Sequence, residues 1–169
     1  MEKHQGMITF GGNPLTLVGT MVKEGDTAKD FTVLANDLKP HKLSDYSGKT
    51  RIISVVPSID TGVCAAQTRR FNVEAAKLEN VVILTISCDL PFALGRFCAA
   101  EGIDKVITLS DHKETDFGLK YGFLIEELRL LSRGIVIVDK DGIIRYVEYV
   151  KEVTTHPDYD KALEMLKKI

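Results

Sequence analysis

The sequence predicts an α/β protein whose mixed central sheet is covered by helices on both faces. Two apolar runs rich in β-branched residues, 51–56 and 81–87, lack the polar alternation of a half-exposed strand. Such runs are typical of strands buried on both faces, and each is followed by a helical pattern. The Asp-Gly pair at residues 141–142 separates two further apolar runs, 134–138 and 143–149, and therefore predicts an antiparallel hairpin.

The N-terminal third is expected to contain short strands and one helical turn. Apolar runs at residues 7–10 and 15–18 flank Gly11-Gly12-Asn13-Pro14, which favours a β-hairpin with a four-residue connection. After it we expect a strand over residues 31–35, a short partner strand over 41–43 and a helical turn over 43–46.

The first long helix is expected to begin on or just before Cys64 and to run to about residue 78, where Asn80 closes it. Its apolar residues Phe71, Ala75 and Leu78 recur at positions i, i+4 and i+7. This spacing is typical of the face that a helix turns toward a protein core.

A second helix should follow the second buried strand, with Asp89 or Leu90 as its cap and Pro91 in its first turn. It carries Phe97 and Cys98 and is expected to stop at Glu101-Gly102. After it we expect a strand over residues 106–109, a short helix over 115–121 that ends at Gly122, and a partly ordered loop over 123–132. A last helix should begin near Pro157. Its apolar face is expected to carry Tyr159, Ala162, Leu163 and Leu166.

This order of elements predicts a thioredoxin-like fold. Strand–helix–strand units followed by an antiparallel hairpin and a closing helix produce a mixed sheet with helices on both faces. We expect residues 1–169 to form a single domain, in which residues 1–20 are an N-terminal hairpin extension. The chain contains no internal repeat and no low-complexity segment.

The composition narrows the classes of partner. Net charge is −2, and basic and acidic residues are spread along the chain, so neither a nucleic-acid face nor a membrane-binding patch is expected. No apolar run approaches the length of a membrane span. The first ten residues lack the features of a secretory signal, so we expect a cytoplasmic location.

Three cysteines, Cys64, Cys88 and Cys98, are the main candidates for chemistry. An odd, low count does not suggest a structural disulfide framework, which leaves redox chemistry, metal binding or simple burial. No Cys/His cluster has metal-ligand spacing, no C-x-x-C motif is present, and no phosphate-binding glycine loop follows a strand.

Cys64 follows a polar turn and lies in the first turn of a predicted helix. Unpaired amides and the helix dipole at such a position favour a thiolate, which is the nucleophilic form of cysteine. The alternative is a buried cysteine that acts as a small hydrophobe. The polar turn favours the reactive interpretation.

Three other residues are candidates for supporting Cys64. The Thr61 hydroxyl either caps the helix or donates to the sulfur or to a bound oxygen, and these two roles are compatible. Pro57 either shields the thiolate or simply ends the strand. Arg133 precedes an apolar strand and is placed to reach a site at the mouth of the fold, although most arginines are solvated.

Cys98 lies on the helix after that of Cys64, so the two form a candidate redox pair. The alternative is burial of Cys98 beside Phe97. Cys88 is expected to be a small hydrophobe at the end of a strand. Two other functions remain open, a hydrolase with a Cys–His pair and a non-catalytic thioredoxin-fold binding module.

The segment PSIDTGVCAAQTRRFN resembles the thiol peroxidase branch of the peroxiredoxins. The similarity also includes FTVLANDL, DLPFALGRFC, LLSRGIVIVD and THPDYDKAL, and so extends over nearly the whole chain. It implies that Cys64 is the peroxidatic cysteine, with Pro57, Thr61 and Arg133 as its companions. It also implies that Cys98 is the resolving cysteine of an atypical two-cysteine enzyme, whose disulfide forms within one chain.

The same resemblance implies hydrogen peroxide and organic hydroperoxides as substrates, thioredoxin as the reductant and a homodimer. No metal or organic cofactor is needed, because the thiolate is the electron donor. Cys88 departs from the family pattern, since that position is not catalytic there, and it introduces the risk of a wrong disulfide.

Overall fold

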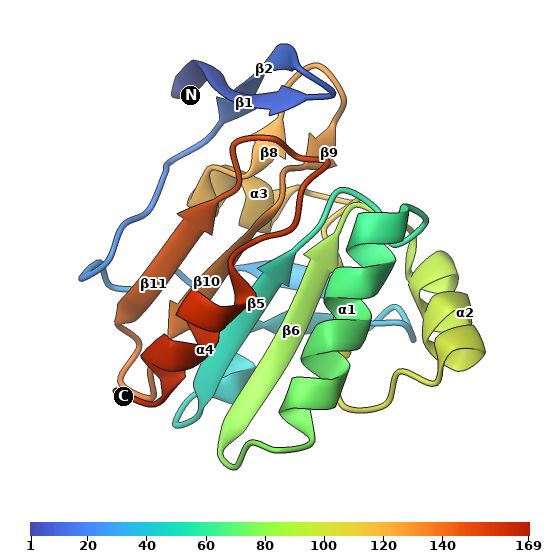
Figure 1. The fold of residues 1–169 in the computed structure, drawn as a ribbon, viewed down its shortest axis with the longest axis vertical. Helices are drawn as coiled ribbons and strands as arrows, with labels where there is room; N and C mark the ends of the chain where they lie inside the picture. The colour runs from blue at the N-terminus through green and yellow to red at the C-terminus, as the bar shows by residue number, and fades with distance from the viewer.

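The computed structural model describes residues 1–169, and a seven-stranded sheet forms its centre (Figure 1). Three central strands run parallel and the outer strands run antiparallel, so the predicted mixed sheet is confirmed. In sheet order the strands are β11 (Ile144–Tyr149), β10 (Gly134–Val138), β5 (Thr50–Val55), β6 (Val81–Ser87), β7 (Ile107–Ser110), β3 (Thr32–Leu34) and β4 (Pro40–Lys42).

Helices cover both faces of this sheet, as predicted. In Figure 1, α1 (Gly62–Ala75) and α4 (Tyr159–Leu166) lie in front of it and α3 (Asp116–Tyr121) lies behind. Alternation along β5 explains the two layers, because successive side chains point to opposite faces of a strand. Ile52 belongs to the cluster under α1 and α4, and its neighbour Ile53 belongs to the cluster on the α3 side.

The N-terminal hairpin is confirmed, but its connection has two residues and not four. It joins β1 (Lys3–Phe10) to β2 (Asn13–Val18) through Gly11 and Gly12, both with positive φ. Two glycines suit a tight hairpin turn because they adopt positive φ without steric cost. Asn13 and Pro14 therefore belong to the strand.

A second, four-stranded sheet forms around this hairpin. The segment predicted as a partly ordered loop contains β8 (Leu124–Ile125) and β9 (Leu130–Leu131). β2 pairs with β8, which pairs with β9. Two-residue strands leave no periodic signal in a sequence, and their partner is far away in the chain, so the sequence patterns did not reveal them.

The first and second helices begin where the sequence predicts. α1 starts at Gly62 with Thr61 as its N-cap, but it ends at Ala75, earlier than expected. Asn80, with a φ of 56°, then turns the chain into β6. α2 (Pro91–Glu101) has Leu90 at its N-cap position.

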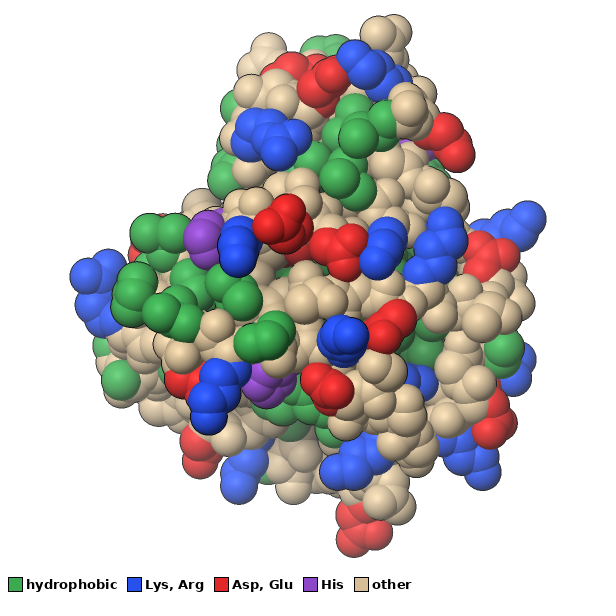
Figure 2. Space-filling view, turned by 180° about the vertical axis from the view of Figure 1, so that it is seen from behind, with side chains coloured by type: hydrophobic (Ala, Val, Ile, Leu, Met, Phe, Trp, Pro, Cys, Tyr) green, Lys and Arg blue, Asp and Glu red, His purple; other side chains and the backbone are tan.

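The remaining local predictions agree with the structure to within a residue or two. A 3-10 turn, η1, spans Leu43–Tyr46, and the glycines at the ends of α2 and α3 both adopt the left-handed conformation. None of the helices is long and apolar enough to cross a lipid bilayer. Acidic and basic side chains are interspersed over the rear face (Figure 2).

Candidate active site

Cys64 lies in the first turn of α1, the helix that follows β5 in the chain. The buried Pro57 follows the strand, a polar turn comes next, and Thr61 caps the helix with extended backbone angles. This arrangement places Cys64 in the first helical turn, where amides lack internal partners. Its side chain is fully buried in a small cluster with Val56 and Leu94.

Two donors point at the Cys64 sulfur. The Thr61 hydroxyl donates to it over 2.6 Å, and the Arg133 Nη2 donates over 3.1 Å. The hydroxyl also accepts from the Cys64 amide at 3.4 Å, so Thr61 caps the helix and contacts the sulfur at once. The permanently charged guanidinium and the hydroxyl therefore both donate to the same sulfur.

Arg133 is buried, and each of its three guanidinium nitrogens donates a hydrogen bond. It immediately precedes β10, and only 2% of its surface is exposed. Its Nε donates to the Val153 carbonyl at 2.7 Å, and its Nη1 donates to Gln67 Oε1 at 2.8 Å. A guanidinium suits this role because its donors form a rigid, planar fork. The remaining Nη2 is aimed at Cys64 by these contacts.

Gln67 is a residue of the site that the sequence patterns did not single out. It is fully buried, and its amide nitrogen donates to Ser54 Oγ at 2.8 Å while its oxygen accepts from Arg133. The available signal was its position three residues after Cys64, since residues at i and i+3 share a helix face.

Cys98 lies on α2 and is half-buried. Its sulfur is 3.3 Å from Thr108 Oγ1, whose own hydrogen is donated to Asn36. The Cys98 thiol is therefore the donor to Thr108. All three cysteines are free, so no disulfide joins Cys64 and Cys98 in this structure.

Cys88 is separated from the other two cysteines by the sheet. It packs against the core cluster on the α3 face, whereas Cys98 packs on the opposite cluster. Burial, aided by the charges of Asp111 and Asp89, raises the pKa of the Cys88 thiol to about 12. The thiol therefore stays protonated and weakly reactive at neutral pH.

The histidine that a Cys–His hydrolase needs is not paired with Cys64. His4 is hydrogen-bonded to Gly19, and His41 and His156 are each bonded to a tyrosine. No group of three or more His, Cys, Asp or Glu side chains is arranged to hold a metal ion.

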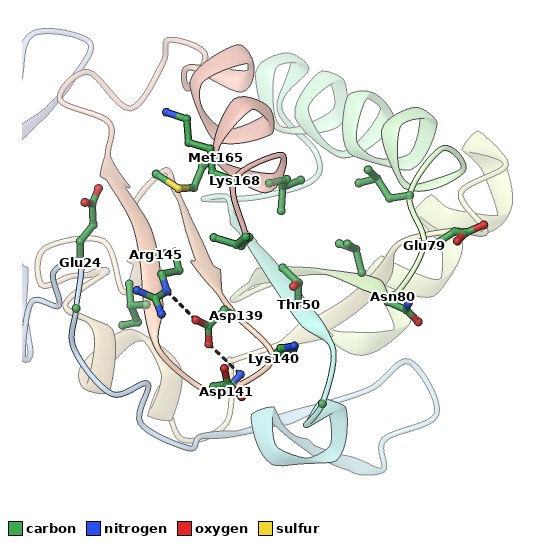
Figure 3. Close-up of a pocket in the computed structure, with 17 residues that line it drawn as sticks. Glu24, Thr50, Glu79, Asn80, Asp139, Lys140, Asp141, Arg145, Met165 and Lys168 are labelled. Carbon is green, nitrogen blue, oxygen red and sulfur yellow. Dashed lines mark hydrogen bonds and ion pairs between the residues drawn. The ribbon is translucent and has the colours of Figure 1, made fainter.

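A wide cavity lies at the other end of the sheet (Figure 3). It has a volume of about 970 Å³ and is lined by the starts of β5 and β6 and by the β10–β11 turn, where Arg145 pairs with Asp139. Neither Cys64 nor Arg133 lines it. The candidate chemistry is therefore at a buried sulfur and not in this cavity.

A thioredoxin-like fold that buries a cysteine beneath an arginine and a threonine defines a thiol-based redox protein. Comparisons with known proteins identify the family. The family model described as Redoxin matches residues 23–163. The chain belongs to the Redoxin family and, within it, to the thiol peroxidases of the peroxiredoxin type, which confirms the resemblance found in the sequence.

Individual relatives agree with this assignment. A thiol peroxidase of Oceanobacillus iheyensis is 65% identical over 161 residues, which cover 95% of this chain and 98% of the relative. A thiol peroxidase of Bacillus subtilis is 59% identical over 160 residues, covering 95% and 96%. The crystal structure of a peroxiredoxin-like protein from Aquifex aeolicus has a TM-score of 0.90 and 38% identity, covering 98% of both chains.

Proposed function

We propose that the protein reduces hydrogen peroxide and organic hydroperoxides with Cys64 as the attacking thiolate. One observation carries the proposal, namely that the Cys64 sulfur accepts hydrogen bonds from both Thr61 and Arg133 at a helix N-terminus. The same two donors suit the oxygens of a peroxide. Pro57, buried in the preceding turn, limits the access of water to the sulfur.

In the first step the Cys64 sulfur attacks the nearer peroxide oxygen. An S–O bond forms, the O–O bond breaks, and the farther oxygen leaves as an alcohol or water after taking up a proton, so Cys64 becomes a sulfenic acid. Donors from Thr61 and Arg133 hold the peroxide in line and stabilise charge on the leaving oxygen. Because Val153 and Gln67 already fix Arg133, little reorganisation accompanies the reaction.

In the second step Cys98 resolves the sulfenic acid. Its sulfur attacks the Cys64 sulfur, an S–S bond forms, and the oxygen leaves as water with the thiol proton. Before the reaction the two sulfurs have different hydrogen-bond partners, so both sulfurs must leave these partners for the bond to close. A dithiol reductant, which we propose is thioredoxin, then reduces the intrachain disulfide.

The proposal includes a cytoplasmic homodimer. Its support is the family resemblance together with apolar side chains exposed at the start of α2, Leu90 at 53% and Phe92 at 69%. Hydrophobic side chains gather near one edge of the rear face in Figure 2. Sedimentation of the reduced protein tests the dimer, because a monomer at micromolar concentration would contradict it.

Replacement of single cysteines tests the function. In a stopped-flow assay with thioredoxin as the electron donor, Cys64→Ser should lose essentially all peroxide turnover. Cys98→Ser should consume about one equivalent of peroxide, because it can form but not resolve the sulfenic acid. Cys88→Ser is the matched control and should turn over like the parent protein. Substantial turnover by Cys64→Ser would remove Cys64 from the mechanism.

A further inference from the structure

The Asp89 carboxylate fastens the turn before Cys64 to the segment that leads into the Cys98 helix. It accepts hydrogen bonds from Ser58 Oγ at 2.7 Å and from the Ile59 amide at 2.9 Å. The same carboxylate accepts from Ser87 Oγ, at the end of β6, at 2.7 Å. One side chain thus joins the turn before α1, a central strand and the start of α2.

The backbone of Asp89 is itself hydrogen-bonded to the sheet, which fixes the position of the carboxylate. Its amide donates to Ser87 Oγ at 3.2 Å, and its carbonyl oxygen accepts from the Ser110 hydroxyl. Hydrogen bonds to a carboxylate are roughly twice as strong as neutral ones. The turn at Ser58 and Ile59 is therefore anchored to the sheet through a single charged group.

This anchor resists the movement that the second step requires. Cys64 is packed with Leu94 of α2, and its sulfur is bonded to Thr61 and Arg133. The Cys98 sulfur is bonded to Thr108 instead. A disulfide requires the two Cα atoms to lie within about 7 Å and the sulfurs to touch. The Cys64 sulfur must therefore leave Thr61 and Arg133, and the Cys98 sulfur must leave Thr108, before the bond can form.

We propose that Asp89 is a positioning residue that holds the Cys64 turn closed for reaction with peroxide and, by its release, sets the rate of disulfide formation. This inference rests on the proposed function. In the step concerned, the Cys98 sulfur displaces the oxygen of the Cys64 sulfenic acid, and that oxygen leaves as water with the thiol proton. Slow release leaves the sulfenic acid exposed to a second peroxide, which converts it to the sulfinic acid and releases water or an alcohol.

Asp89→Asn is the principal test. The amide is neutral and keeps one acceptor oxygen where the carboxylate has two, so the bonds to Ser58, Ile59 and Ser87 lose their charge assistance. This loss should raise the fraction of molecules with an open turn about tenfold. Disulfide formation, which occurs from the open turn, should then accelerate about tenfold. The closed turn remains the major form, so the peroxide step should change less than about twofold.

The two steps are measured separately by rapid acid quench followed by intact mass, which distinguishes thiol, sulfenic acid and disulfide. The chain has no tryptophan, so fluorescence offers no simple substitute. Faster disulfide formation should also raise, by about the same factor, the peroxide concentration that produces sulfinic acid. Substitution of a residue with only a structural role would not raise both the rate of disulfide formation and the peroxide concentration that produces sulfinic acid.

Asp30→Asn is the matched control. Its carboxylate also accepts three bonds, from Ser44 Oγ at 2.8 Å, the Ser44 amide at 3.0 Å and the Phe31 amide at 3.1 Å, at a turn without a cysteine. This variant should lower stability without changing either rate. Ser58→Ala is a second variant that removes one bond to the Asp89 carboxylate and should also accelerate the disulfide step about tenfold.

Disulfide formation at the parent rate or slower in both Asp89→Asn and Ser58→Ala, with the peroxide step intact, would overturn the Asp89 proposal alone. Equal acceleration in Asp30→Asn would also overturn it. Failure of the proposed function has a different signature, since peroxide would then be consumed without Cys64.

Discussion

Arg133 immediately precedes β10 and Cys64 lies in α1, yet the guanidinium Nη2 and the sulfur are 3.1 Å apart in the interior of the protein. The sequence separation of the pair is 69 residues, so only the paired strands β5 and β10 bring them together. Val153 and Gln67 complete the environment of the guanidinium. The geometry of the site therefore depends on the planar arrangement of the Arg133 donors and not only on the positive charge of the side chain.

Arg133→Lys should retain the positive charge and lose the planar set of donors. A lysine cannot donate to Val153, Gln67 and Cys64 in the same planar arrangement, so the peroxide oxygens would be poorly positioned. We expect the second-order rate constant with peroxide to fall about a hundredfold, as for loss of one preorganised donor. Arg145→Lys, at the ion pair with the buried Asp139 far from Cys64, is the control and should react normally. An unimpaired Arg133→Lys would contradict the positioning role.

Gln67→Leu should cost both stability and rate. The apolar side chain leaves Arg133 Nη1 and Ser54 Oγ without their partner in a fully buried region. Burial of unsatisfied polar groups of this kind costs about 1–3 kcal/mol. Urea denaturation of the reduced protein measures the loss of stability, and the peroxide assay measures the rate. Parent-like values for both would show that Gln67 does not support Arg133.

Cys88 should react slowly with iodoacetamide at neutral pH. Because the pKa of its thiol is raised to about 12, the thiolate fraction is very small at pH 7 and grows about tenfold for each pH unit. The alkylation rate of Cys88 in a Cys64→Ser/Cys98→Ser background should therefore rise from pH 7 to pH 10 without a plateau. A plateau below pH 9 would contradict the assigned environment of this cysteine.

Asp111 should make stability depend on pH in an unusual direction. Burial raises the pKa of this carboxyl to about 7, although it accepts from the amides of Phe117 and Gly118. The folded state then binds more protons than the unfolded state between about pH 4 and pH 7. The contribution of Asp111 to stability is therefore present at low pH and is lost as pH rises to 7.

Comparison of Asp111→Asn with the parent protein isolates this effect. The free energy of unfolding, measured by urea denaturation from pH 5 to pH 8, should decline less steeply in the variant. The two proteins should differ in this decline on the order of a few kcal/mol across the window. Parallel curves for the two proteins would show that Asp111 titrates normally.

The sequence predicted the parts of the fold that have local signals. Thr61 and Cys64 mark a helix start because the cap and the first turn are adjacent in the chain, and Pro91 marks another for the same reason. The β10–β11 hairpin followed from its Asp-Gly turn. Each of these signals depends on neighbouring residues and needs no knowledge of distant contacts.

The features that sequence patterns missed are those made by distant contacts. The pairing of β2 with β8 joins residues more than a hundred positions apart, and neither strand of β8–β9 is long enough to show a period. Gln67 contributes to the site because it accepts a hydrogen bond from Arg133, which the fold places beside it. Asp89 and Leu90 were the two expected caps of α2; Leu90 takes the N-cap position, and the Asp89 carboxylate accepts from Ser58 instead.

The most direct test of the account is the identity of the disulfide formed after one equivalent of peroxide. Tryptic cleavage separates the three cysteines into peptides 52–69, 78–96 and 97–105, so every pairing has its own mass. We predict a single linked product joining the peptides of Cys64 and Cys98 within one chain. A product containing the Cys88 peptide, or three cysteines still free while peroxide is consumed, would contradict the proposed mechanism.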